Sequence, residues 1–293
     1  MSIAGLHHVT ATSGPPRPNL DFYTGALGLC LVKRTVNFDD PSVYHLYFGD
    51  QAGHPGTIMT TFPFPNARAG RAGPGATSAV IFATPDPAAR LEGLTKAGVK
   101  ITAGQRFGVA TWCFSDPDGL DLELVEGREG LAGVTLWLAD PEPTARLLTE
   151  IFGFEVGPEE REGKGTRLRL TLPGEAPGRV VHLWRTEASP SARGGAGSVH
   201  HIAFRARDRA HQDELAEALR ARGEHLTDRK DRQYFESVYF REPGGVLFEI
   251  ATDAPGFEID EPAASLGQSL KLPGWLEPDR PRIEAALPPL EPA

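Results

Sequence analysis

The sequence predicts an α+β protein in which four βαβββ modules pair into two curved sheet cups. The first observation behind this prediction is an internal repeat: an opening strand, an amphipathic helix and a closing strand led by glycine recur four times. The second is a steady spacing, because matched strand positions lie between 44 residues apart (Ala79 to Glu123) and 52 residues apart (His8 to Thr60). Helices alternating with several short strands are typical of α+β folds, and each module is expected to curl around a cleft.

Each module is expected to open with a short strand and to continue into a helix. The opening strands fall at residues 6–11, 78–83, 133–138 and 199–205, and Pro or Asp follows each of them within a few residues. The amphipathic runs that follow lie at residues 19–26, 87–97, 141–151 and 209–222. The helices are expected to stop at Gly28, Gly98, Gly153 and Gly223, since glycine adopts the left-handed conformation that ends many helices.

The closing strands share a pattern of one glycine plus four residues, at 56–60, 119–123, 178–182 and 245–249, and turn signals precede each of them. The repeat divides the chain into an N-terminal domain at residues 1–130 and a C-terminal domain at residues 131–293, each with two modules. The C-terminal domain adds a Pro-rich tail after Asp253, with a weak helical stretch at 283–286. We expect this tail to pack along the surface or at a subunit contact of a homo-oligomer.

Composition narrows the class of protein. The formal net charge of −9 over 293 residues, without a basic run, argues against a nucleic-acid surface. No stretch approaches 18 apolar residues, so no membrane span is expected, and no secretory signal opens the chain. The two cysteines, Cys30 and Cys113, have no CxxC spacing and are expected to be reduced thiols in the core. These features predict a cytoplasmic protein.

Superposing the four modules brings chemically distinct residues to two equivalent positions. The opening-strand position holds His8, Ala79, Gly133 and His201, and the closing-strand position holds Thr60, Glu123, His182 and Glu249. Alternate residues of a strand point to opposite faces, so each position has a fixed orientation toward its cleft. If the first and fourth modules share a cup, His8, His201 and Glu249 converge there. Two imidazoles and one carboxylate with open remaining positions are typical of the facial triad of non-haem Fe(II) oxygenases.

The second and third modules would then form the other cup. Small residues, Ala79 and Gly133, stand there at the positions of the histidines, so this cup is predicted to lack a metal site. Glu123 and His182 are interpreted as a structural polar pair. A His-His dipeptide at a strand start is also compatible with a packed, hydrogen-bonded pair, and the metal interpretation depends on two such dipeptides in equivalent strands with a matching Glu249.

Several motifs resemble those of one known group. They are LHHVT at residues 6–10, YHLYF at 44–48, GTIMTTF at 56–62, VHHIAF at 199–204, YFES at 234–237, GGVLFE at 244–249 and SLG at 265–267. Over nearly the whole chain they resemble the vicinal oxygen chelate superfamily, and within it the hydroquinone ring-cleaving dioxygenases. The resemblance implies Fe(II), or less commonly Mn(II), held by His8, His201 and Glu249.

The resemblance also places His7, His200, Arg232 and Tyr239 near the substrate as catalytic residues. Tyr239 is expected on the strand antiparallel to that of Glu249, where its hydroxyl can reach a bound phenolate. His200 could relay a proton, and Arg232 could hold an anionic ring substituent. On sequence alone, a surface position for Arg232, a packed strand position for His7 and a core position for Tyr239 remain open. His45 fits a cup-lining or a core role equally well.

The resulting hypothesis is a ring-cleaving dioxygenase that takes O2 and a small hydroquinone-type or catechol-type aromatic. One alternative is a glyoxalase-like isomerase or thiol transferase on the same scaffold. Against the glyoxalase version stands Thr60, because glyoxalase sites usually carry four protein ligands. The other alternative is a non-catalytic quinone-binding or drug-binding resistance protein, which needs no metal triad.

Overall fold

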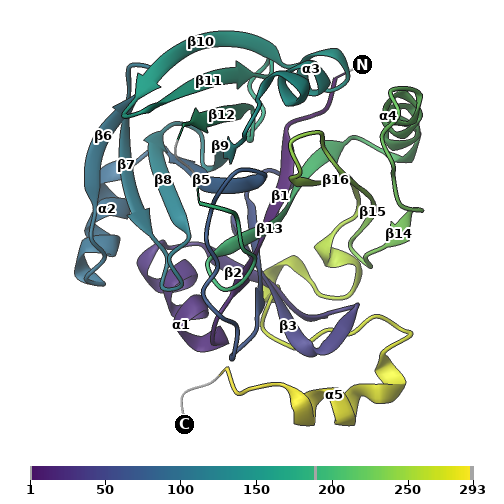
Figure 1. Ribbon diagram of the computed structural model, residues 1–293. Helices are drawn as coiled ribbons and strands as arrows, with labels where there is room; N and C mark the ends of the chain where they lie inside the picture. The colour runs from purple at the N-terminus through teal and green to yellow at the C-terminus, as the bar shows by residue number, and fades with distance from the viewer. Residues whose placement is uncertain (1, 188–189, 291–293) are drawn as a thin grey trace.

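The computed structural model describes residues 2–187 and 190–290, and its strands form two eight-stranded sheets (Figure 1). The first sheet has the order β14-β15-β16-β13-β1-β4-β3-β2 and combines the first and fourth modules. Its strands are β1 (Leu6–Ser13), β2 (Cys30–Asn37), β3 (Asp40–Gly49), β4 (Ile58–Pro63), β13 (Ser198–Ala206), β14 (Lys230–Asp231), β15 (Phe235–Arg241) and β16 (Leu247–Pro255). We call its concave face the first cup.

The second sheet has the order β10-β11-β12-β9-β5-β8-β7-β6 and combines the second and third modules. Its strands are β5 (Ala76–Thr84), β6 (Thr102–Arg106), β7 (Val109–Ser115), β8 (Asp121–Glu126), β9 (Gly130–Trp137), β10 (Glu155–Glu162), β11 (Gly165–Thr171) and β12 (Val180–Thr186). We call its concave face the second cup. The predicted α+β fold, with four modules in two curved cups, is confirmed. The division at residue 130 stays a prediction, and each proposed half contributes strands to both sheets.

Strand register confirms that the repeat positions are equivalent. At the centre of the first sheet β1 runs antiparallel to β13, with Val9 opposite Ile202. At the centre of the second sheet β5 runs antiparallel to β9, with Val80 opposite Val134. All four side chains are fully buried in one apolar cluster shared by both sheets. Because side chains alternate along a strand, the neighbours of these residues point the other way, into the cups.

The helices fall close to the predicted runs. They are α2 (Pro87–Lys96), α3 (Glu142–Glu150) and α4 (Arg209–Ala221), while the first run forms α1 (Pro16–Leu20) and continues as the π-helix η1 (Asp21–Ala26). The side chains of Asp86 and Asp208 cap α2 and α4 by accepting backbone N–H bonds. The first helix begins earlier than predicted because Pro16 suits the first helical turn, where a missing N–H costs nothing.

The closing strands begin later than predicted. Gly56, Gly119, Gly178 and Gly245 all have positive φ angles, between 69° and 98°. They therefore form the turn before each strand rather than its first residue, a conformation that glycine adopts without a steric cost.

The prediction that both cysteines lie in the core is wrong, since Cys30 is exposed and Cys113 is only partly buried. None of the described helices is both long and apolar enough to cross a bilayer.

A buried lysine is one of the residues that attach the C-terminal tail to the first sheet, together with a backbone hydrogen bond from Lys271 N to Arg34 O at 2.9 Å. Lys33 of β2 is fully buried, and its Nζ donates to Phe257 O at 3.1 Å, to Asp260 Oδ1 at 2.5 Å and to Glu261 Oε2 at 2.6 Å. The tail then continues through η2 (Phe257–Ile259), η3 (Ala263–Ser265), η4 (Glu277–Asp279) and α5 (Arg280–Ala286). In Figure 1, α5 lies below β3.

Replacing Lys33 with methionine is expected to lower the free energy of unfolding by about 3 kcal/mol, because two carboxylates lose the buried cation that neutralises them. Urea unfolding followed by circular dichroism measures this change. The matched control is Lys96→Met, since Lys96 forms an exposed pair with Glu92 and should change stability by less than about 0.5 kcal/mol. Equal losses in the two variants would contradict the assigned role of Lys33.

Candidate metal centre

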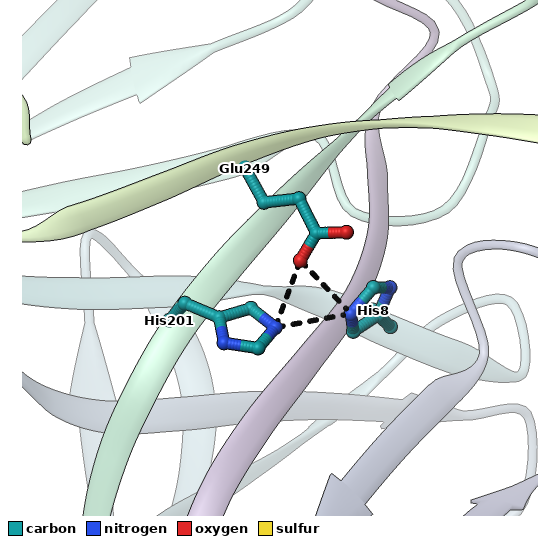
Figure 2. A group of neighbouring side chains, drawn as sticks. All are labelled: His8, His201 and Glu249. Atoms are coloured by element: carbon teal, nitrogen blue, oxygen red, sulfur yellow. Dashed lines mark hydrogen bonds and ion pairs between the residues drawn. The ribbon is translucent and has the colours of Figure 1, made fainter. Parts of the chain in front are cut away.

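Two histidines reach the first cup from its central pair of strands. In the antiparallel pairing of β1 with β13, His8 lies opposite Ala203 and His201 lies opposite Thr10. Both histidines therefore occupy the same face of the sheet, because each lies two residues along its strand from the residue that pairs with the other. Glu249 arrives from β16, which runs parallel to β13 and places Glu249 beside Ala203. The three side chains converge from three adjacent strands (Figure 2).

The donor atoms of this group lie close together. His8 Nε2 is 3.3 Å from His201 Nε2, His201 Nε2 is 2.8 Å from Glu249 Oε2, and His8 Nε2 is 3.5 Å from the same oxygen. All three residues are buried. Metal-to-ligand bonds of roughly 2.1 Å place neighbouring ligand atoms about 3 Å apart. Over residues 2–187 and 190–290 this is the one group of three or more His, Cys, Asp or Glu side chains with such spacing.

The charge of the group suits a divalent cation. Burial alone would raise the pKa of Glu249, but the neighbouring His8 and His201 hold that pKa well below its ordinary value. Burial lowers the pKa of His201, which favours the neutral imidazole that a metal requires. Glu249 uses its other oxygen, Oε1, to accept a hydrogen bond from the Ser237 hydroxyl. One carboxylate and two imidazoles thus face a common point.

Each of these histidines is oriented by its neighbour in sequence. His7 Nδ1 lies 2.8 Å from His8 Nδ1, and His200 Nδ1 lies 2.8 Å from His201 Nδ1. A neutral imidazole that binds a metal through Nε2 carries its proton on Nδ1 and donates it outward. His7 and His200 are therefore placed as acceptors. His7 is buried against Phe235, with ring centroids 5.0 Å apart.

A small cavity opens in front of the three donors. Its volume is about 200 Å³. Aromatic side chains and polar groups share its wall, which is formed by His8, Asn37, Phe38, Asp39, His45, Tyr47, Phe62, Phe64, His200, His201, Arg232, Phe235 and Tyr239. His200, Arg232 and Tyr239 of the predicted catalytic set reach this cavity, whereas His7 lies behind His8, away from the wall.

Tyr239 and Arg232 form a pair at the cavity wall. Tyr239 lies directly opposite Glu249 in the antiparallel pairing of β15 with β16, as the sequence predicts. Arg232 Nε donates to the Tyr239 hydroxyl at 3.1 Å, and its guanidinium lies 5.3 Å from the centre of the Tyr239 ring. Arg232 Nη2 also contacts Asp39 Oδ2 at 3.1 Å, which joins the β14–β15 segment to the β2–β3 turn. Burial, followed by the charge of Glu249, raises the pKa of Tyr239, so this phenol stays protonated.

Two further residues, His45 and Tyr47, line the cavity. The sequence left the role of His45 open and did not single out Tyr47. The Tyr47 hydroxyl donates to His45 Nδ1 at 2.9 Å, and His45 Nε2 then donates to Thr60 Oγ1 at 2.9 Å. Thr60 in turn donates to Thr10 Oγ1 at 2.8 Å. Thr60 occupies the fourth position of the cup, and its hydroxyl takes part in this series of hydrogen bonds. The alternation in YHLYF at 44–48 places His45 and Tyr47 on one face, which was the available signal.

Among the residues that the structure describes, the second cup has no such donor set. Glu123 stands where Glu249 stands in the first cup, and its partner is Arg106, with Oε1 3.4 Å from Nε. The expected polar pair of Glu123 with His182 is thus replaced, and His182 packs against Phe107 at 5.0 Å between ring centroids. A Cβ at Gly133 would lie 1.9 Å from Val180 O, so no histidine fits at that position.

Fold and site together define a protein with two βαβββ-pair cups, one of which gathers a two-histidine, one-glutamate cluster at an aromatic cavity. The family model of the Glyoxalase/Bleomycin resistance protein/Dioxygenase superfamily matches residues 5–124 and 130–250. The chain belongs to this superfamily.

Relatives extend over almost the whole chain. A Bacillus subtilis (strain 168) protein provisionally named ring-cleaving dioxygenase MhqO is 44% identical over 310 residues, covering 98% of this chain and 96% of its own. The chlorohydroquinone/hydroquinone 1,2-dioxygenase of Sphingobium indicum is 34% identical over 303 residues, covering 94% of this chain and 93% of its own. These names support an enzyme of the dioxygenase kind.

Solved structures agree with the fold. A crystal structure from Bacillus subtilis subsp. subtilis str. 168, provisionally described as a dioxygenase, superposes with a TM-score of 0.92 at 41% identity, covering 99% of this chain and 98% of that one. Glyoxalase I from Zea mays superposes with a TM-score of 0.66 at 17% identity, covering 85% of this chain and 92% of that one. The second likeness concerns the fold alone.

Removing any member of the cluster is expected to abolish metal binding in the first cup. His8→Ala, His201→Ala and Glu249→Gln should each weaken the binding of Fe(II) by more than about 100-fold, because each substitution removes one of three donors. Anaerobic titration with Fe(II), followed by metal analysis of the desalted protein, measures the loss. Glu123→Gln is the matched control at the equivalent position of the second cup and should retain full binding. A loss of iron in Glu123→Gln equal to that in Glu249→Gln would contradict this assignment.

Proposed function

We propose that the protein is a ring-cleaving dioxygenase in which His8, His201 and Glu249 hold Fe(II), or less commonly Mn(II), and that it opens hydroquinone-type or catechol-type aromatics with O2. The observation that carries the proposal is the pairing of a three-donor cluster with an aromatic-walled cavity. Three protein donors leave positions for both a substrate oxygen and O2. The bound metal would make the substrate hydroxyl more acidic and would pass electrons between the aromatic ring and O2.

The size and lining of the cavity support a single-ring substrate. A volume of about 200 Å³ suits one substituted benzene ring better than a fused or extended molecule. Phe62, Phe235 and Tyr47 supply flat apolar surfaces on which a ring can pack. The polar groups are confined to a few positions, which is how small-molecule sites fix the orientation of a ligand.

The polar residues of the wall have separable proposed roles. His200 accepts the Nδ1 proton of His201, so its own ring proton lies on Nε2 and is available to a substrate or product oxygen. Tyr239, kept protonated by burial, donates a hydrogen bond to a phenolate oxygen. Arg232 holds the Tyr239 hydroxyl in place and contributes positive charge beside the developing anion.

His7 is proposed to act on the metal ligand rather than on the substrate. It contacts His8 Nδ1 and lies outside the cavity wall, and burial keeps it neutral by lowering its pKa. A neutral His7 fixes the orientation of the His8 ring, as outer histidine partners do in other metal sites.

The same observations weigh against the glyoxalase-like alternative. A fourth protein ligand would have to come from Thr60, whose hydroxyl already accepts from His45 and donates to Thr10. A purely binding role, in turn, gains nothing from three buried metal donors. Catalytic turnover distinguishes these alternatives from ring cleavage.

Iron-loaded protein is expected to consume one O2 per hydroquinone oxidised and to yield a ring-opened carboxylic product. An oxygen electrode and mass spectrometry of the product measure this. Protein loaded with Zn(II) should consume no O2, because Zn(II) has no redox chemistry. The proposal fails if iron-loaded protein consumes no O2 with hydroquinone, catechol or their chlorinated derivatives.

Tyr239→Phe is expected to lower kcat by about 100-fold while leaving bound iron unchanged, because the substitution removes a hydroxyl proton donor but no metal ligand. Steady-state oxygen uptake and metal analysis of the same sample measure the two effects separately. Tyr44→Phe is the control, since Tyr44 is buried in β3 outside the cavity wall. An unchanged kcat in Tyr239→Phe would remove Tyr239 from the catalytic set.

A further inference from the structure

The second cup contains a large cavity that the proposed reaction does not use. A space of about 1100 Å³ opens at the concave side of the second sheet, and Ala79, Arg106, Glu123, Arg167 and Trp184 contribute to its wall. A second cavity of about 60 Å³ shares Arg106 and Glu123 with it and has His182 in its wall. The cavity therefore occupies the place that the metal centre occupies in the first cup, with Ala79 at the position of His8.

Several buried polar atoms in this cup have no hydrogen-bond partner among the residues that the structure describes. His182 is 4% exposed, and neither of its ring nitrogens has a partner. Glu123, also 4% exposed, has an Oε2 atom in the same condition. The indole nitrogens of Trp137 and Trp184 are buried and likewise unmatched. Buried polar groups are rarely left without partners in folded proteins, so this concentration of unmatched groups points to a ligand.

The charged residues of the inner wall balance one another. Arg106 lies 2.7 Å from Glu162 and 3.4 Å from Glu123, while Arg167 Nε donates to Glu162 at 2.8 Å. Two guanidinium groups therefore face two carboxylates. Over both cavities the lining holds five basic and five acidic side chains. A net charge on a ligand would gain no net attraction here and would lose its hydration, so an uncharged ligand fits this wall best.

The unmatched groups also specify the ligand's own chemistry. The indole N–H of Trp184 requires an acceptor, the Glu123 oxygen requires a donor, and a neutral His182 offers one of each. Burial lowers the pKa of His182 to about 3, which keeps it neutral. Trp137 packs against Trp184 with ring centroids 4.3 Å apart and ring planes inclined by 47°, and Trp184 presents an aromatic ring to the cavity. Hydroxyl groups on an aromatic ring meet all of these requirements together.

We propose that the second cup is a metal-free binding site for an uncharged aromatic hydroxyl compound, built from Glu123, His182 and Trp184. The site lies in a different sheet from the metal centre. The residues that line the second cup support this site, and it does not depend on the chemistry proposed for the first cup. The protein would then bind one class of small aromatic in two cups that share an architecture and differ in their donor sets.

Isothermal titration calorimetry of the full-length, metal-free protein under anaerobic conditions tests this inference with hydroquinone as the probe. Two equivalents of hydroquinone are expected to bind, one in each cup. For one of the two, Ala79→Phe should weaken binding by about tenfold or more by filling the second cup, and Glu123→Gln should weaken it by about tenfold by changing the unmatched acceptor. Tyr44→Phe is the control, since Tyr44 lines the cavity of neither cup, and it should leave the titration unchanged.

Two results would overturn the inference: hydroquinone producing no binding heat, or Ala79→Phe and Glu123→Gln both binding it as tightly as the unaltered protein. If benzoate, which is anionic at neutral pH, binds as tightly as hydroquinone, the assignment of an uncharged ligand is wrong. Because the titration uses neither iron nor O2, a failure of the proposed dioxygenase activity leaves its outcome unaffected. Iron-loaded Ala79→Phe should retain normal oxygen uptake, which also reports that this variant folds.

Discussion

The antiparallel pairing of β1 with β13 is the interaction on which the rest of the site depends. It joins residues 193 positions apart in the chain, and its register sets His8 and His201 on one face with their Nε2 atoms 3.3 Å apart. A slip of one residue would turn either histidine into the apolar layer that Val9 and Ile202 occupy. The packing of these fully buried residues therefore holds the register, and the register in turn holds the donor set.

The two cups share one scaffold but differ in what their walls hold. In the second cup, close backbone packing at Gly133 excludes any side chain, and Arg106 neutralises the carboxylate at the position of Glu249. In the first cup Glu249 faces two imidazoles, and Ser237 satisfies its remaining oxygen. A duplicated module thus retains its carboxylate position in both cups, while the residues around that position decide whether a cation or a protein guanidinium neutralises it.

Much of this arrangement could be predicted from the sequence, because it follows from periodicity. The four-module repeat aligns His8 with Ala79 and Glu249 with Glu123, and strand register bears out that alignment. The parts that could not be predicted depend on long-range contacts. The contact of Arg232 with Asp39 and Tyr239 depends on how two turns meet across the cup. Glu123 pairs with Arg106, at the end of β6, instead of with His182, and no local sequence pattern predicts this contact. The attachment of the tail through Lys33 is likewise a contact between distant parts of the chain.

We propose that His8, His201 and Glu249 would hold a metal that supports the insertion of both atoms of O2 into an aromatic ring. Turnover of hydroquinone by iron-loaded protein under isotopically labelled O2, followed by mass spectrometry of the freshly formed product, tests this most directly. The account predicts a ring-opened product in which both oxygen atoms of one O2 molecule are retained. A ring-intact quinone without label, or a ring-opened product labelled only from water, would contradict it.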